Sequence, residues 1–201
     1  MMNSFIHRIL FDPHNFQSVV QACVAGNRSA QRELFKKYFS YGKSICFRYT
    51  ASPEEAEEVL NEGFLKVFNN LGKYDPDYPF KAWLRTIMVN TAISHYRKTR
   101  KYNDAWVSLD HFSDFDLDDS DDVLNQTATQ EILQVIQQLR PIYRTVFLMN
   151  AVDGYALNEI SELLNMNNAT VRSHYFRARQ ELRERLAQEY PHLSGRIGQM
   201  N

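Results

Sequence analysis

Apolar positions along this chain recur with helical spacing, and no region shows the sustained alternation of a strand. Residues 71–79 contain one glycine and two prolines, which break helices, so this stretch is expected to be a loop. The expected helices of the first half cover residues 16–25, 29–49, 53–70 and 80–100. Ser52, Pro53 and Glu55 form a helix-start signal, with a capping serine, a proline in the first turn and a glutamate three residues after the cap. The pattern predicts an all-α fold.

The second half contains the most informative pattern. One segment carries apolar residues in a 4-3-4-4 spacing, at Val171, Tyr175, Ala178, Leu182 and Leu186. The face beside this seam carries Arg172, Ser173, Phe176 and Arg177. A shorter apolar-periodic segment precedes it, at Leu157, Ile160, Leu163 and Leu164, and the polar turn 165–168 joins the two. A helix, a short turn and an arginine-rich helix are typical of the helix-turn-helix, whose second helix enters the DNA major groove. The pattern also fits an ordinary helical hairpin with a solvated basic face.

Charge divides the chain although the net charge is only -1. Residues 85–101 are basic and almost free of acid, whereas residues 104–122 are acidic and contain no lysine or arginine. Because salt screens charges beyond about 8 Å, a near-neutral total does not argue against nucleic-acid binding. The predicted divisions are an N-terminal extension over 1–15, a first helical domain over 16–101, an acidic linker over 102–128, a second helical domain over 129–190 and a tail over 191–201.

Several function classes find no support in the sequence. The two cysteines form no CxxC pair, the six histidines are scattered, and there is no glycine-rich phosphate loop. We therefore expect no metal, no cofactor and no enzymatic activity. The N-terminus lacks a secretion signal, and no run of 18 apolar residues occurs. The simplest expectation is a reduced, cytoplasmic protein with no direct membrane insertion.

Two helices of the first half carry candidate binding surfaces. In the helix expected from residue 80, Trp83, Ile87 and Thr91 can face a core, and we favour a core position for Trp83. The polar candidates for bases and phosphates are Arg85, Asn90, Arg97, Lys98, Arg100 and Lys101. The aromatic residues able to stack on or wedge against unpaired bases are Tyr74, Tyr78 and Trp83. A solvated amphipathic helix is the alternative. The helix from residue 54 begins with an acidic surface, which suits the helix dipole but exceeds what capping needs and fits a basic protein partner.

The order of these segments resembles the sigma-70 family of transcription initiation factors, in its small two-domain extracytoplasmic-function (ECF) group. Residues 57–68 are similar to region 2.2, 80–93 to regions 2.3 and 2.4, 139–148 to region 4.1, and 157–179 to region 4.2. The resemblance covers roughly three quarters of the chain. Departures occur at Ser94, Ser161 and Ala169, where the family commonly has aspartate, alanine and glycine. Ser94 removes a charge beside the basic cluster, which affects the expected promoter preference but not the fold.

The resemblance implies a dissociable subunit of bacterial RNA polymerase that helps to melt promoter DNA. Glu58, Asn61 and Glu62 would dock on the core polymerase. The -10 element would be read by Asn90 and by the loop with Tyr74 and Asp75, and adjacent phosphates would be held by Arg97, Lys98 and Arg100. The -35 element would be read by Arg172, Ser173, Phe176 and Arg177. The acidic linker would bridge the two promoter elements or serve as a solvated tether. An anti-sigma factor is a further expected partner.

Three other classes compete with this interpretation. A stand-alone helix-turn-helix regulator would bind duplex DNA without polymerase, but it leaves the acidic helix and the Trp83 helix unexplained. An enzyme lacks any supporting motif. The third class is a pure interaction protein, such as an adaptor. Binding to core polymerase separates the first interpretation from all three.

Overall fold

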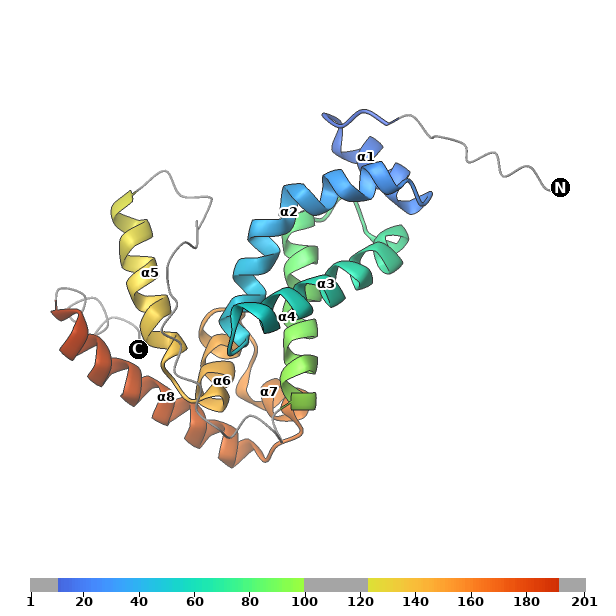
Figure 1. Ribbon diagram of the computed structural model, residues 1–201. Helices are drawn as coiled ribbons and strands as arrows, with labels where there is room; N and C mark the ends of the chain where they lie inside the picture. The colour runs from blue at the N-terminus through green and yellow to red at the C-terminus, as the bar shows by residue number, and fades with distance from the viewer. Residues whose placement is uncertain (1–10, 100–122, 192–201) are drawn as a thin grey trace.

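The computed structural model describes residues 11–99 and 123–191, with backbone only at 123–129. These residues form helices and no strand, so the all-α prediction is confirmed for the part of the chain described (Figure 1). The elements are α1 (Phe16–Val24), α2 (Arg28–Tyr49), α3 (Pro53–Asn70), the short 3-10 helix η1 (Leu71–Lys73), α4 (Phe80–Thr99), α5 (Val123–Gln137), α6 (Pro141–Ala151), α7 (Leu157–Leu164) and α8 (Asn168–Glu189).

Helices α1 to α4 form the first unit, in which α2 packs against α1, α3 and α4. The close approach of α3 to α4 depends on Gly63, because a Cβ atom there would lie 2.4 Å from the sulfur of Met88. Gly42 has the same role toward α3, where a Cβ would lie 2.8 Å from Cδ1 of Leu60. An aromatic cluster closes the end of this unit near the loop 71–79, and its members are Phe16, Tyr38, Tyr74, Phe80 and Trp83.

The predicted start of α3 is confirmed. Pro53 is its first residue, and the Ser52 hydroxyl accepts a hydrogen bond of 3.2 Å from the backbone N–H of Glu55. The Glu55 carboxylate accepts from the N–H of Ala51, at 2.9 Å, and not from that of the cap itself. The two bonds satisfy donors at the start of the helix, where no intrahelical acceptor is available.

Helices α5 to α8 form the second unit, in which α8 packs along α5, α6 and α7. The turn between α7 and α8 contains Asn165 in the left-handed conformation, with φ of 50°, followed by Asn167, whose side chain caps α8. The predicted seam of α8 lies in the core: Val171, Ala178, Leu182 and Leu186 are buried, and Tyr175 is half-buried against it. The helix-turn-helix prediction is therefore confirmed as a structure.

The boundaries differ clearly from expectation at two places. Residues 71–73 of the expected loop form the 3-10 helix η1, and α5 begins earlier than expected. Helix α5 begins at Val123, so residues 123–128, which we expected in the linker, are helical. Residues 123–128 contain no acidic residue themselves, and the expected linker was extended into them from the Asp-rich segment 104–122. The rest of the expected linker, residues 102–122, lies outside the described residues, as do Arg100 and Lys101.

The two units also contact each other directly, which the sequence did not predict. Helix α6 packs against the C-terminal end of α2, and α7 packs against α4 (Figure 1). No helix in the described ranges is long and apolar enough to cross a membrane.

Candidate nucleic-acid interface

The outer face of α8 presents the four residues predicted to read duplex DNA. Arg172, Ser173, Phe176 and Arg177 are all exposed, on the side of the helix opposite its buried seam. Phe176 is 68% exposed, more than any other large hydrophobic residue described. A phenyl ring so far from the core contributes little to folding, and between arginines it offers an apolar surface to a thymine methyl or a sugar.

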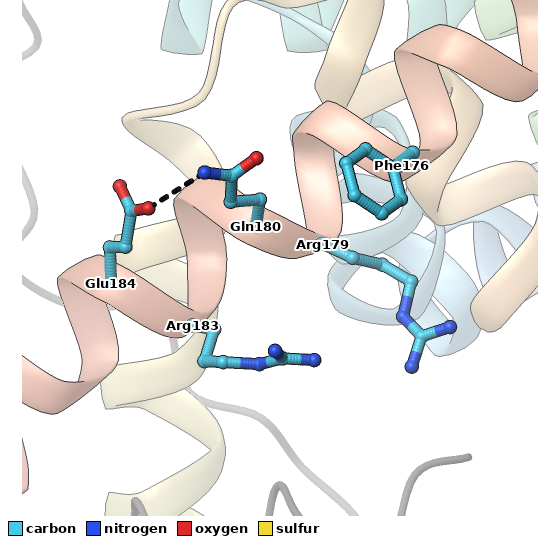
Figure 2. A pocket seen from close by; sticks show the side chains of 5 residues that line it. All are labelled: Phe176, Arg179, Gln180, Arg183 and Glu184. Atoms are coloured by element: carbon cyan, nitrogen blue, oxygen red, sulfur yellow. Dashed lines mark hydrogen bonds between the residues drawn. The ribbon is translucent and has the colours of Figure 1, made fainter.

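Two arginines extend this face toward the C-terminus of α8. Arg179 and Arg183 lie three and seven residues after Phe176 and, with Gln180 and Glu184, line a shallow pocket on the same side (Figure 2). The Arg179 guanidinium lies 5.9 Å from the centre of the Tyr175 ring, and Gln180 donates a hydrogen bond of 3.0 Å to Glu184. Neither arginine was predicted to lie on this face, although both follow Phe176 at helical spacing in the sequence.

Helix α6 contacts α8 beside this face, through Tyr143. Arg177 donates to the hydroxyl of Tyr143, at 3.3 Å, and the ring of His174 lies 5.3 Å from the Tyr143 ring. Burial lowers the pKa of His174 below its ordinary value, and the positive charge of Arg177 lowers it further. The imidazole therefore stays neutral at physiological pH and does not add charge to the face.

The polar face of α4 is arranged differently. Asn90 is exposed, and its Oδ1 accepts a long hydrogen bond of 3.5 Å from the hydroxyl of Tyr155 in the second unit. Arg97 and Lys98 are exposed in the last turn. Arg85, a phosphate candidate in the sequence, instead forms an ion pair of 2.6 Å with Asp153. The basic surface of α4 is thus concentrated at its C-terminal end.

The loop before α4 contains two residues predicted to contact the -10 strand, of which Tyr74 is half-buried and Asp75 is exposed. Tyr74 packs against Phe80 and Trp83, with ring centres 5.2 and 5.3 Å apart, and its hydroxyl donates to the carbonyl of Tyr78. Trp83 is half-buried against the core, as favoured from the sequence. Asp75 is exposed and accepts a hydrogen bond from the N–H of Asp77. Tyr78, 54% exposed, is the ring of this loop that is available for stacking.

The acidic face of α3 lies beside the C-terminal end of α4, since the charge of Lys98 acts on the Glu62 carboxylate. Glu58 and Asn61 are exposed, and Glu62 forms an ion pair of 2.8 Å with Lys66. The hydrogen bond from Lys66 lowers the pKa of Glu62. Leu65, which the sequence analysis missed, is 60% exposed and lies one turn after Asn61. Together Glu58, Asn61, Glu62 and the exposed Leu65 form a surface suited to a basic protein partner that also presents an apolar patch.

The described residues contain no cluster of histidine, cysteine or acidic side chains able to hold a metal ion. Both cysteines are buried, which raises the pKa of the Cys23 thiol to about 11 and that of Cys46 to about 12. Neither thiol is a reactive group under physiological conditions.

Comparisons with known proteins identify the family. The profile of Sigma-70 region 2 matches residues 34–102, and that of Sigma-70, region 4 matches residues 129–182. The ECF RNA polymerase sigma factor SigW of Bacillus subtilis is 30% identical over 170 residues, which cover 80% of this chain and 91% of SigW. The RNA polymerase sigma-H factor of Pseudomonas aeruginosa is 28% identical over 178 residues, covering 83% of this chain and 91% of that protein.

Solved structures give a weaker likeness. The sigma factor RpoE of Bartonella quintana, solved in complex with the anti-sigma factor NepR, covers 79% of this chain and 97% of its own at 16% identity, with a TM-score of 0.46. The family rests on the sequence matches.

The chain belongs to the sigma-70 family, within its ECF group. It is a sigma factor, which directs RNA polymerase to promoters, and a stand-alone regulator is not favoured. Sigma factors initiate transcription without being enzymes themselves.

Proposed function

We propose that three surfaces of this sigma factor divide the work of initiation. The α3 face of Glu58, Asn61, Glu62 and Leu65 binds core polymerase, and the outer face of α8 reads the -35 duplex. Asn90, with the segment 69–80 that connects α3 to α4, captures the -10 strand. The observation that carries the proposal is the exposed quartet on α8, which stands on a helix-turn-helix and is separate from the acidic face of α3.

The α8 face supports direct reading of bases. A guanidinium can bind guanine through two hydrogen bonds, which discriminates by about 1–3 kcal/mol. Arg172 is the better candidate for this contact, because Arg177 already donates to Tyr143. Arg179 and Arg183 lie further along the helix, beside an acidic Glu184, and are assigned to phosphates.

The α4 face supports strand capture. The Asn90 amide has the donor and acceptor that a base edge requires, and Arg97 and Lys98 lie about two turns further along the helix, where a phosphate backbone would pass. Unstacking a base costs a few kcal/mol, so the exposed Tyr78 ring and Asp75 beside it offer compensating contacts. Arg100 belongs to the same proposal by its place in the sequence.

The test is run-off transcription with core polymerase on a library of genomic promoters. We expect specific transcripts with the wild-type chain and none with the double variant Glu58→Lys, Glu62→Lys, which should also fail to co-elute with core polymerase. Glu33→Lys, at an exposed acid on α2, is the matched control and should behave as wild type. If the double variant still co-elutes with core polymerase, the α3 face is not the polymerase-binding surface.

Two further expectations rest on family membership. The protein acts in the cytoplasm, where polymerase and DNA are, and an anti-sigma factor holds it inactive until a signal arrives. Co-purification of a tagged chain, followed by inhibition of the run-off assay with the isolated partner, tests the second expectation.

A further inference from the structure

Arginines lie on two different sides of α8. Successive residues of an α-helix are turned by about 100° from one another, so Arg177 points almost opposite to Arg179, two positions later. Arg183 lies one turn after Arg179 on the same side, and Figure 2 shows their two side chains extending in the same direction. The exposed Ser173 and Phe176 lie between these two sides, on the face that is proposed to meet the bases.

The side of α8 that carries Arg177 continues onto the start of α6. Nη1 of Arg177 donates to the hydroxyl of Tyr143, at 3.3 Å. The guanidinium of Arg140, the residue that precedes α6, lies 5.8 Å from the centre of the same Tyr143 ring. The ring is buried and also contacts His174, with ring centres 5.3 Å apart, so its position is fixed. One rigid tyrosine thus positions two guanidinium groups, one from each helix.

The charge of Arg140 is not used within the part of the chain that the structure describes. The side chain is exposed and forms neither an ion pair nor a hydrogen bond with the residues described. Glu181, one turn after Arg177 on α8, is paired with Arg185 at 2.9 Å, so its charge is already compensated. Because Arg140 rests on an aromatic ring, its guanidinium loses less conformational freedom when it binds an anion.

The dimensions of B-DNA give the two sides of α8 different targets. The major groove is about 12 Å wide, and a helix with its side chains is about 10–12 Å across. A helix in the groove therefore fills it, and each of its sides faces one of the two phosphate backbones. The side with Arg179 and Arg183 then faces one strand, and the side that leads from Arg177 to Arg140 faces the other. A guanidinium binds phosphate oxygens through two parallel N–H groups.

We propose that Arg140 binds a phosphate of the -35 duplex, on the DNA strand opposite to the strand held by Arg179 and Arg183. The inference rests on the proposed reading of the -35 duplex by α8, and it adds to that site a residue from a different helix. Tyr143 is a positioning residue, whose ring orients Arg140 and whose hydroxyl orients Arg177. The two strands are thus held from two helices, with the reading face between them.

The experiment removes single phosphate charges and single arginines in combination. The full-length chain is assembled with core polymerase, and binding is measured on a promoter fragment selected in the run-off assay. A methylphosphonate replaces one phosphate at a time across the -35 region, on each strand in turn. Arg140→Ala should weaken binding about fivefold, and equally for cognate and scrambled -35 sequences, because a phosphate contact carries no sequence information.

The pattern of sensitive phosphates identifies the contact. In Arg140→Ala, the loss of affinity caused by methylphosphonate should disappear at one or two positions of one strand, and in Arg183→Ala at positions of the other strand. Arg140→Lys keeps the charge and should retain the wild-type pattern in part, whereas Arg28→Ala, at an exposed position on α2, should retain it fully. Tyr143→Leu should lose the same phosphate as Arg140→Ala, and Tyr143→Phe, which keeps the ring, should not. Circular dichroism confirms that each variant keeps its helices.

The outcomes are distinct. Losses on opposite strands in Arg140→Ala and Arg183→Ala support the proposal. It is overturned if Arg140→Ala keeps every sensitive phosphate of the wild type, or if the two variants lose phosphates on the same strand. If the wild type binds cognate and scrambled -35 sequences equally, the proposed reading by α8 fails, whereas the phosphate pattern still shows whether Arg140 contacts DNA.

Discussion

The two surfaces proposed to bind DNA differ in their state in the free protein. On α8, Arg172, Ser173 and Phe176 stand exposed on a helix that is anchored by a buried seam. On α4, Asn90 meets the hydroxyl of Tyr155, and Arg85 of the same helix is bound to Asp153 of the other unit. A face that reads duplex can be fully formed in advance, since duplex DNA is always present. A face that captures a single strand is needed only after the DNA has melted. The contacts of Tyr155 and Asp153 with α4 therefore do not weaken the preceding step, the binding of duplex DNA.

The largest effect is expected on the preformed face. Arg172→Ala and Arg177→Ala should each weaken binding to the -35 duplex by about 1–3 kcal/mol if the arginines contact bases. Fluorescence anisotropy with the cognate duplex and a scrambled duplex measures the loss. Arg28→Ala, an exposed arginine on α2, is the control and should change neither. Equal losses on both duplexes would show that these side chains hold phosphates and do not read sequence.

A substitution on the polar face of α4 should affect transcription only at the step of DNA melting. Asn90→Ala should lower open-complex formation about fivefold, the loss of about 1 kcal/mol from one hydrogen bond. Binding to polymerase and to the -35 duplex should remain nearly unchanged. Permanganate footprinting measures the effect, and Thr86→Ala, one turn earlier on the exposed side of α4, is the control.

A template already unpaired over the -10 region sharpens this prediction. The unpairing cost is then absent, so the defect of Asn90→Ala should be partly rescued. An equal defect on duplex and pre-melted templates, with unaltered footprints, would contradict a role for this helix in strand capture.

A smaller and uniform effect is expected at the C-terminal extension of the α8 face. Arg179→Ala and Arg183→Ala should weaken binding to all duplexes alike, and each should reduce the slope of log affinity against log salt by about 1. Titrations at several salt concentrations measure the slope. If either variant instead loses the preference for one duplex sequence, the substituted arginine contacts bases and not only phosphates.

The smallest effect concerns the support of the α8 face. Burial and Arg177 lower the pKa of His174, so the unfolded chain binds this proton first as the pH falls below 6.5. The contribution of neutral His174 to stability is present above that pH and is lost as the pH falls toward the folded pKa. In urea unfolding at pH 7.5 and 5.5, His174→Gln should lose less stability than wild type. Equal losses of stability in His174→Gln and in the wild type would show that other titrating groups determine the pH dependence.

The sequence predicted those parts of the structure that depend on neighbouring residues. The Ser52 cap, the loop 71–79 and the seam of α8 are local patterns, in which a few residues determine the backbone and the buried face. The helix-turn-helix followed from the same periodicity. Its extension to Arg179 and Arg183 was present in the spacing but was overlooked.

The contact between the units could not be predicted in this way. The carboxylate of Asp153 meets Arg85, which lies 68 positions away. Gln137 meets a carbonyl that lies 90 positions away, and nothing near either residue marks the pairing. Such contacts depend on how whole units dock, so they become visible only with coordinates.

Gly63 has a consequence for the exchange of segments between related sigma factors. The residue lies directly after Glu62, and any Cβ there would meet the sulfur of Met88 on the helix that carries Asn90. The absence of one side chain therefore sets the separation between the polymerase-facing helix and the strand-capturing helix. A chimaera that takes α4 from a relative inherits a different neighbour for this glycine unless position 88 is kept. Designers who wish to change promoter preference should accordingly transplant positions 63 and 88 as a pair.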